Sequence, residues 1–368
     1  MISREPHFIF LHFRPIMNYK YAVAVLLLIW GISGCQGCNK KKGRDKPDVS
    51  GINAEVSILR FDLDLQGFLK QDFEAHQQMM KNKYGAFYHF YTAQFIAGTD
   101  PERDSSDVAQ DIIIKYLSDP YIHRVQDSIN KYYADTKDIE KDLSQALKYF
   151  KYYFPTISIP KVITVNSGFS LSAFTYDEKY LAIGLEMYLG PQNPDYDSVG
   201  IYQYLRHKMS REYIARNSME ALCNLYLEKS ESSRENTLME AMVEKGKKLY
   251  LLSYLFPDAP DSLLVGFTTE QTLWCEQNDY EVWKFLNDKD ILYKSDFMDQ
   301  KRYLDEGPTT QGMPAEAPGN IGSWLGLQIV RKFVKESGRT IPLSELILKY
   351  DPKTIAAKAK YRPSKSVF

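Results

Sequence analysis

The sequence predicts a single α+β domain that is mainly helical and contains a small antiparallel sheet. Over most of the chain, apolar residues recur at intervals of three or four, the spacing that places them on one face of a helix. Near the middle, three short segments rich in β-branched and aromatic residues lie between turn-forming residues, which indicates strands. The chain has 368 residues, 44% of them hydrophobic, and is therefore long enough to bury one large core.

Residues 1–34 are typical of a secretion signal. The apolar run 22–33 is shorter than the about 18 to 20 residues that cross a bilayer, so it does not predict a membrane span. Lys20 precedes it, and a basic start, a short apolar stretch and small residues, in that order, form a cleavable signal. Because the residues before Met17 complete no targeting pattern, Met17 is the expected start of translation.

The signal ends in residues 32–35 (ISGC), which resemble the lipobox of bacterial lipoproteins. Cleavage before Cys35 would leave a thiol that carries lipid, including palmitate, and would anchor the chain in the cell envelope. The alternative is an ordinary signal with an incidental cysteine. Residues 35–51 form the expected lipidated N-terminus and flexible polar tether, and residues 52–368 form the globular domain. We expect the anchored protein to face the periplasm, on the inner or the outer membrane.

Composition excludes some functions and leaves others open. The chain has 46 Lys and Arg against 47 Asp and Glu, so no nucleic-acid partner is predicted. Its 27 Tyr and 19 Phe permit a sugar-binding surface, although aromatic residues more often fill cores. Cys223 and Cys275 lie in apolar helical patterns, and their spacing leaves open whether they form a disulfide or remain free thiols.

The first part of the domain is expected to begin with a strand. In residues 54–68, apolar residues alternate with Asp62 and Asp64, the period of a half-buried strand with solvated aspartates. From residue 69 to residue 154 the apolar spacing becomes helical.

The sheet is expected to be a meander. Residues 162–166, 171–176 and 180–190 have strand composition, and the turn sequences Asn-Ser-Gly and Asp-Glu-Lys separate them. Short turns join antiparallel neighbours, so these segments predict a three-stranded antiparallel sheet.

Four helices are expected in the remainder, over residues 211–230, 238–256, 269–286 and 321–334. The third opens with a capping box formed by Thr268 and Gln271. In the fourth, Gly322 and Gly326 leave a flat strip on which another backbone can lie close.

The order of helices, sheet and paired helices resembles that of zincin-type metallopeptidases. Their motif, His-Glu-x-x-His, places two imidazoles four residues apart so that both reach one metal. After Cys35 the sequence has only four histidines, no two within five residues, at positions His76, His89, His123 and His207. Glu244 lies where the resemblance places a third ligand, so it is interpreted as the vestige of a metal site. We expect no metal or other cofactor, and we expect His207 to be a partly exposed surface residue.

Several longer segments resemble the gliding motility lipoprotein GldB family of Bacteroidota, namely residues 181–190, 242–258, 268–286, 318–334 and 360–363. The resemblance implies a zincin-like fold without the histidine pair. It also implies partners among the envelope proteins of the gliding or type IX secretion machinery, and it offers no catalytic residue.

Two classes of function remain. The first is a non-catalytic pseudoenzyme, a lipid-anchored scaffold or assembly factor for gliding motility or type IX secretion. Its former peptide cleft would hold an extended segment of a partner. The alternative is an envelope hydrolase, a degenerate or atypical peptidase with a site near Glu244.

Overall fold

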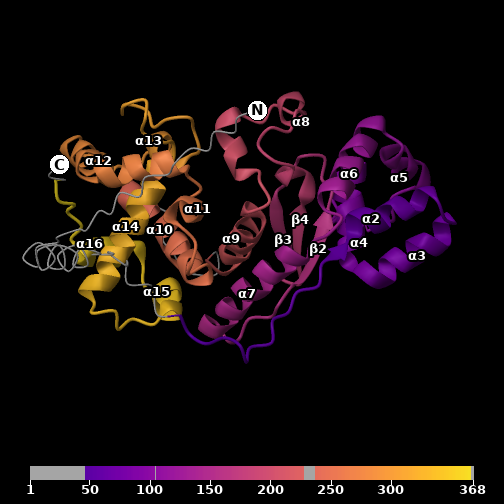
Figure 1. Ribbon diagram of the computed structural model, residues 1–368, viewed down its shortest axis with the longest axis horizontal. Helices are drawn as coiled ribbons and strands as arrows, with labels where there is room; N and C mark the ends of the chain where they lie inside the picture. Colours follow the sequence, from indigo (N-terminus) through magenta and orange to yellow (C-terminus); the bar gives the residue numbers. More distant parts are fainter. Residues whose placement is uncertain (1–45, 104, 228–236, 366–368) are drawn as a thin grey trace, which may run out of the picture. The chain divides into compact units, whose positions relative to one another are not determined.

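The computed structural model describes residues 46–103, 105–227 and 237–365, within the compact unit Lys46–Phe368 (Figure 1). The strands are β1 Leu59–Arg60, β2 Lys161–Val165, β3 Ala173–Tyr176 and β4 Tyr180–Gly184. The α-helices are α2 Phe61–Leu65, α3 Phe73–Tyr84, α4 Ala86–Tyr91, α5 Gln110–Leu117, α6 Pro120–Tyr132, α7 Lys137–Tyr153, α8 Asp195–Ser198, α9 Tyr213–Leu227, α10 Leu238–Leu255, α11 Asp261–Val265, α12 Thr269–Asp288, α13 Phe297–Leu304, α14 Ile321–Glu336, α15 Leu343–Lys349 and α16 Pro352–Ala359. Short 3-10 helices are η1 Gln66–Leu69, η3 Leu185–Tyr188, η4 Gln203–Lys208 and η5 Ile291–Tyr293, and η2 Thr92–Ala97 is a π-helix. The predicted mainly helical α+β class is confirmed.

The sheet is mixed, and the predicted antiparallel meander is wrong. The strand order is β1-β2-β4-β3, with β1 parallel to β2, β2 parallel to β4, and only β3 antiparallel to β4. After β2 the chain therefore passes beyond the position of β4 and forms the edge strand β3. A tight turn then leads back into β4, which lies between β2 and β3. The Asn-Ser-Gly sequence after β2 begins this crossing loop and not a hairpin. The predicted strand 180–190 is also shorter, because η3 follows Gly184.

Both faces of the central strands are buried, which is why they are continuously apolar. In β4, Leu181 and Ile183 join a large core with α7, α9, α10 and α14. On the opposite face, Tyr180 and Ala182 join a second core of aromatic residues from α2, α3 and α4. Figure 1 shows α2 to α6 on one side of the sheet and α9 to α16 on the other.

The segment 54–68 is mostly not a strand, contrary to its alternating pattern. Only Leu59 and Arg60 pair with β2, and the chain then turns into α2. Asp62, expected in solvent, is 1% exposed because it has partners inside the protein. Its carboxylate receives hydrogen bonds from Arg60 Nε and Nη2 at 2.9 and 2.7 Å and from Thr164 Oγ1 at 2.5 Å. The strand prediction assumed that the aspartates of this segment face solvent. It failed because Asp62 is buried and its charge is compensated by partners inside the protein.

The four helices predicted in the second half of the chain are confirmed as α9, α10, α12 and α14, including the capping box of α12. α9 packs against β3 and β4 and against α10. The glycine strip of α14 lies directly on α10. A Cβ atom added to Gly326 would overlap the carbonyl group of Met242, and one added to Gly246 would overlap the backbone of Gly326. Small residues thus let two buried helices approach to backbone contact.

Candidate functional site

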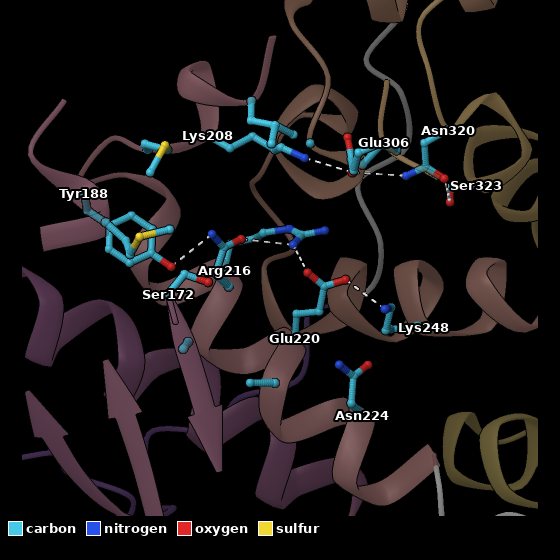
Figure 2. Close-up of a pocket in the computed structure, with 18 of the residues that line it drawn as sticks. Ser172, Tyr188, Lys208, Arg216, Glu220, Asn224, Lys248, Glu306, Asn320 and Ser323 are labelled. Atoms are coloured by element: carbon cyan, nitrogen blue, oxygen red, sulfur yellow. Dashed lines mark hydrogen bonds and ion pairs between the residues drawn. The ribbon is translucent and has the colours of Figure 1, made fainter. Parts of the chain in front are cut away.

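A cavity of about 580 Å³ lies among α9, α10, η3, η4 and the segment that leads into α14. At the start of β3, Ser172 and Ala173 also line it. Figure 2 shows most of its labelled polar side chains in two separate rows, one above the other in the view, with Asn224 below both. Concave sites that gather charged groups from several elements are the usual places where proteins bind ligands, so this cavity is the candidate site.

The face of α9 that lines the cavity is polar. Its lining residues recur at one, three or four positions along the helix, namely Arg216, Asn217, Glu220, Ala221 and Asn224. The opposite face, with Ile214, Met219 and Leu222, is buried in the large core. The helix therefore exposes its charged side to the cavity because its apolar side is held by the sheet and by α10.

The first row of polar groups centres on Glu220. Arg216 donates hydrogen bonds from Nε and Nη2 to the Leu264 carbonyl oxygen, at 3.2 and 2.7 Å, and forms an ion pair with Glu220. The other carboxylate oxygen of Glu220 lies 2.9 Å from Lys248 Nζ. Burial alone would raise the pKa of Glu220, but the charges and hydrogen bonds of Arg216 and Lys248 lower it to about 2. Glu220 is therefore ionised at neutral pH and fixed between two cations.

The second row joins η4 to the beginning of α14. Lys208 Nζ lies 2.8 Å from Glu306 Oε1, and Asn320 Nδ2 donates to the same oxygen at 3.3 Å. Ser323 Oγ in turn donates to Asn320 Oδ1 at 2.5 Å. These contacts hold the loop before α14 against η4, opposite α9.

Lys245 differs from the other cations of the cavity. Its ammonium group donates to the Leu304 carbonyl oxygen and lies 3.4 Å from Asn320 Oδ1, both neutral acceptors. Burial, and then the positive charge of Lys248, lower the pKa of Lys245. Lys245 is thus a partly desolvated cation, and the nearby carboxylates of Glu306, Asp305 and Glu220 offset these effects only in part.

The remaining lining is largely apolar, with Met187, Ile201, Leu205, Met209, Leu249 and Val265. Tyr188 adds a hydroxyl group that accepts a hydrogen bond from Asn217 Nδ2 at 3.1 Å. Burial raises the pKa of Tyr188 to about 12, so this hydroxyl keeps its proton at neutral pH. The cavity can therefore hold a ligand with an apolar part and a polar or charged part.

The residues singled out from the sequence lie elsewhere. Glu244 is not among the residues that line the cavity, and its Oε2 lies 3.4 Å from Lys247 Nζ on the same helix. His207 is partly exposed, as expected, and its ring nitrogens lie 2.9 Å from the carbonyl oxygens of Tyr204 and Gly266. Within the ranges that the structure describes, no group of three His, Cys, Asp or Glu residues could hold a metal ion. The vestigial role of Glu244 stays a prediction.

The cysteines have separate positions. Cys223 lies in α9 and Cys275 in α12, and both are buried free thiols, so the disulfide left open by the sequence is not formed. Burial raises the pKa of each thiol well above its usual value. Cys35, the predicted site of lipidation, lies outside the described residues, as does the predicted signal.

A second notable carboxylate, Glu186, lies in η3 directly beside Met187 and Tyr188 of the cavity lining. It is fully buried, and its Oε1 accepts hydrogen bonds from Ser167 N and Oγ at 2.6 and 2.5 Å and from Phe169 N at 3.2 Å. In the described structure its Oε2 has no hydrogen-bond partner. Burial raises the pKa of Glu186 to about 7. The crossing loop between β2 and β3 is therefore fastened to one oxygen of a buried carboxyl group.

Sequence reasoning missed the charged residues of the cavity. Arg216 and Glu220 are four residues apart on a predicted helix, the spacing of a helical ion pair, and this signal was available. Lys208, Lys245 and Glu306 gave no such signal, because only the packing of distant segments brings them to one cavity.

Comparison with known proteins places most of the chain in one family. A family model described as gliding motility protein GldB matches residues 42–363. No curated protein and no solved structure gives a significant match to the chain. Among the residues that the structure describes, no helix is both long enough and apolar enough to cross a membrane.

Proposed function

The chain belongs to the gliding motility protein GldB family, and from this membership we propose that it acts in the cell envelope as a non-catalytic scaffold or assembly factor of the machinery for gliding. Its partners are other envelope proteins of that machinery or of type IX secretion. The lipid on Cys35 holds it at the membrane, on the periplasmic side. A short tether then keeps the domain close to that membrane, so its partners are proteins that reside there.

The observation that supports a binding role is the position of the cavity beside the edge strand β3. Gly184 N donates to Ser172 O at 3.0 Å, so in an antiparallel ladder the backbone groups of Ala173 point away from β4. Ala173 lines the cavity. An extended segment of a partner can therefore hydrogen-bond to this edge while its side chains occupy the apolar part of the cavity, as in strand addition.

The chemistry of the cavity supports binding over catalysis. A general acid or base works best with a pKa near the operating pH, whereas the pKa of Glu220 is lowered to about 2. Glu186, whose pKa is raised to about 7, is fully buried and does not line the cavity. The Glu220 carboxylate is also engaged by Arg216 and Lys248. A fixed, permanently ionised carboxylate organises the cavity and does not transfer protons at neutral pH.

The proposal is tested by blocking and by photo-crosslinking the cavity in cells of a gliding host that lacks its own copy. Ala221 lines the cavity, so Ala221→Trp fills it, and Lys335→Trp is the matched control on the exposed surface of α14. We expect the Ala221→Trp cells to lose colony spreading and the control cells to spread normally, at equal protein levels and equal melting temperatures.

A photo-crosslinking residue placed at the exposed cavity position Asn224 should join the chain to an envelope protein, and the same residue at Lys335 should not. Normal spreading with a filled cavity, together with no adduct from position 224, would contradict a partner-binding role. Turnover of peptides by the wild-type chain that Ala221→Trp abolishes would contradict the non-catalytic role.

A further inference from the structure

We propose that the partner segment bound in the cavity is acidic, and that Lys245 and Lys248 of α10 hold its carboxylate. This inference deepens the proposed function and rests on it, since it takes the occupant to be a protein segment. It concerns the chemical class of the ligand, which family membership does not specify.

The charge of the cavity lining is unbalanced. Among the described residues, four cations line it, Lys208, Arg216, Lys245 and Lys248, against the two carboxylates of Glu220 and Glu306, which leaves two positive charges. The whole chain, by contrast, has a formal charge of −1. The excess is therefore local, and cavities lined by one sign of charge concentrate ligands of the opposite sign.

The contacts identify where the excess lies. Glu306 is engaged by Lys208, and Glu220 is shared by Arg216 and Lys248. Among the residues that the structure describes, the hydrogen-bond partners of Lys245 are neutral oxygens, those of Leu304 and Asn320. Lys245 and Lys248 are three residues apart on α10, which places both on one side of the helix. Within the described ranges, Glu220 pairs with Lys248, and Glu306, Asp305 and Glu220 offset the charge of Lys245 only in part. A ligand carboxylate between the two lysines would complete their counter-charge.

The rest of the lining indicates that this carboxylate belongs to a peptide and not to a free anion. The volume of about 580 Å³ far exceeds that of one small anion. Two methionines, Met187 and Met209, provide an adaptable apolar surface that an inorganic anion would leave unused. The outward backbone groups of Ala173 match an extended main chain. The expected ligand thus has an aspartate or glutamate close to apolar side chains.

The experiment selects peptides without assuming a sequence. A displayed library of random eight-residue peptides is selected against the purified full chain in detergent, and in parallel against its Lys245→Gln and Lys332→Gln variants. Glutamine keeps a donor for Leu304, and Lys332 pairs with Glu336 on α14, outside the cavity lining. Matching melting temperatures show that all three proteins are folded.

We expect peptides enriched in Asp or Glu next to apolar residues on the wild type and the Lys332→Gln protein, and loss of the acidic preference on Lys245→Gln. Replacing the acidic residue of the best synthetic peptide by its amide should weaken binding about tenfold or more, and added salt should weaken it further. Neutral or basic enriched peptides, or an acidic preference that Lys245→Gln retains, would overturn the ligand class while leaving a peptide-binding cavity.

Failure to enrich any peptide would instead overturn the proposed function of the cavity. If inorganic phosphate competes for the site as strongly as the acidic peptide does, the anion is a free phosphate. If phosphatidylglycerol vesicles compete as strongly, the anion is a lipid headgroup. Either result would overturn the proposal that the ligand is an acidic peptide.

Discussion

Substitution of Gly326 by alanine tests the closest contact of the fold. The new methyl carbon would overlap the Met242 carbonyl group on α10, and backbone atoms cannot rotate away as a side chain does. Overpacking of this kind costs about 1 to 3 kcal/mol, and a backbone clash belongs at the upper end of that range. Alanine is a better helix former than glycine, and this difference stabilises the folded state by about 1 kcal/mol. The net loss of unfolding free energy should therefore be about 2 kcal/mol, which for a domain of this size lowers the melting temperature by about 3 °C.

The measurement is urea and thermal unfolding followed by circular dichroism, with two further glycines as references. A Cβ atom at Gly51 would meet nothing within 4 Å, so Gly51→Ala should be nearly neutral. At Gly322 it would lie 2.7 Å from a methyl group of Leu304 and 2.9 Å from the Tyr303 carbonyl oxygen, so Gly322→Ala should be intermediate. If Gly326→Ala unfolds within about 0.5 kcal/mol of Gly51→Ala, the backbone contact does not stabilise the protein as argued.

Three further predictions concern single residues. Burial raises the pKa of Glu186 to about 7, so the folded state keeps a proton that the unfolded chain loses near pH 4.5. Relative to Glu186→Gln, the wild type should lose about 3 kcal/mol of unfolding free energy between pH 4.5 and pH 7, and parallel pH profiles would refute this. Glu244→Gln should leave colony spreading intact, and elemental analysis of the purified chain should find zinc well below one per chain; about one tightly bound zinc that the variant loses would overturn the absence of a metal site. Labelling of cells with a palmitate analogue should mark the wild type and not Cys35→Ala, and equal labelling of both would exclude lipidation at Cys35.

Helices of the second half of the chain could be predicted because their signals are local. The capping box of α12 and the glycine spacing of α14 depend on residues within a few positions of one another, and both have their expected roles. The sheet could not be predicted in the same way. Strand order depends on whether β2 pairs with β3, as in a meander, or with β4, as observed. The short turn sequence after β2 is compatible with both pairings.

The site was less predictable than the fold for a related reason. The burial of Asp62, outside the cavity, illustrates that reason: its own segment predicts a solvated aspartate, and Arg60 and Thr164 supply the hydrogen bonds that bury it. Similarly, the unbalanced charge of Lys245 becomes evident only when α9, η4 and the start of α14 are assembled around α10. The metallopeptidase motif directs attention to Glu244 instead. The next residue along α10, Lys245, is the one that lines the cavity.

The parallel pairing of β1 with β2 has a consequence for how the protein is made. Leu59 has no strand partner until Ile163 has been synthesised. The strand β4, which pairs with β2, follows later in the chain. Until then the aromatic side chains of α2 to α4, which pack on Ile163, Tyr180 and Ala182 in the finished protein, have no sheet to cover them. Non-local pairing of this kind slows folding and leaves apolar surface open to aggregation. The aromatic side chains of α2 to α4 therefore stay without their sheet partner until residues up to 184 are available for pairing.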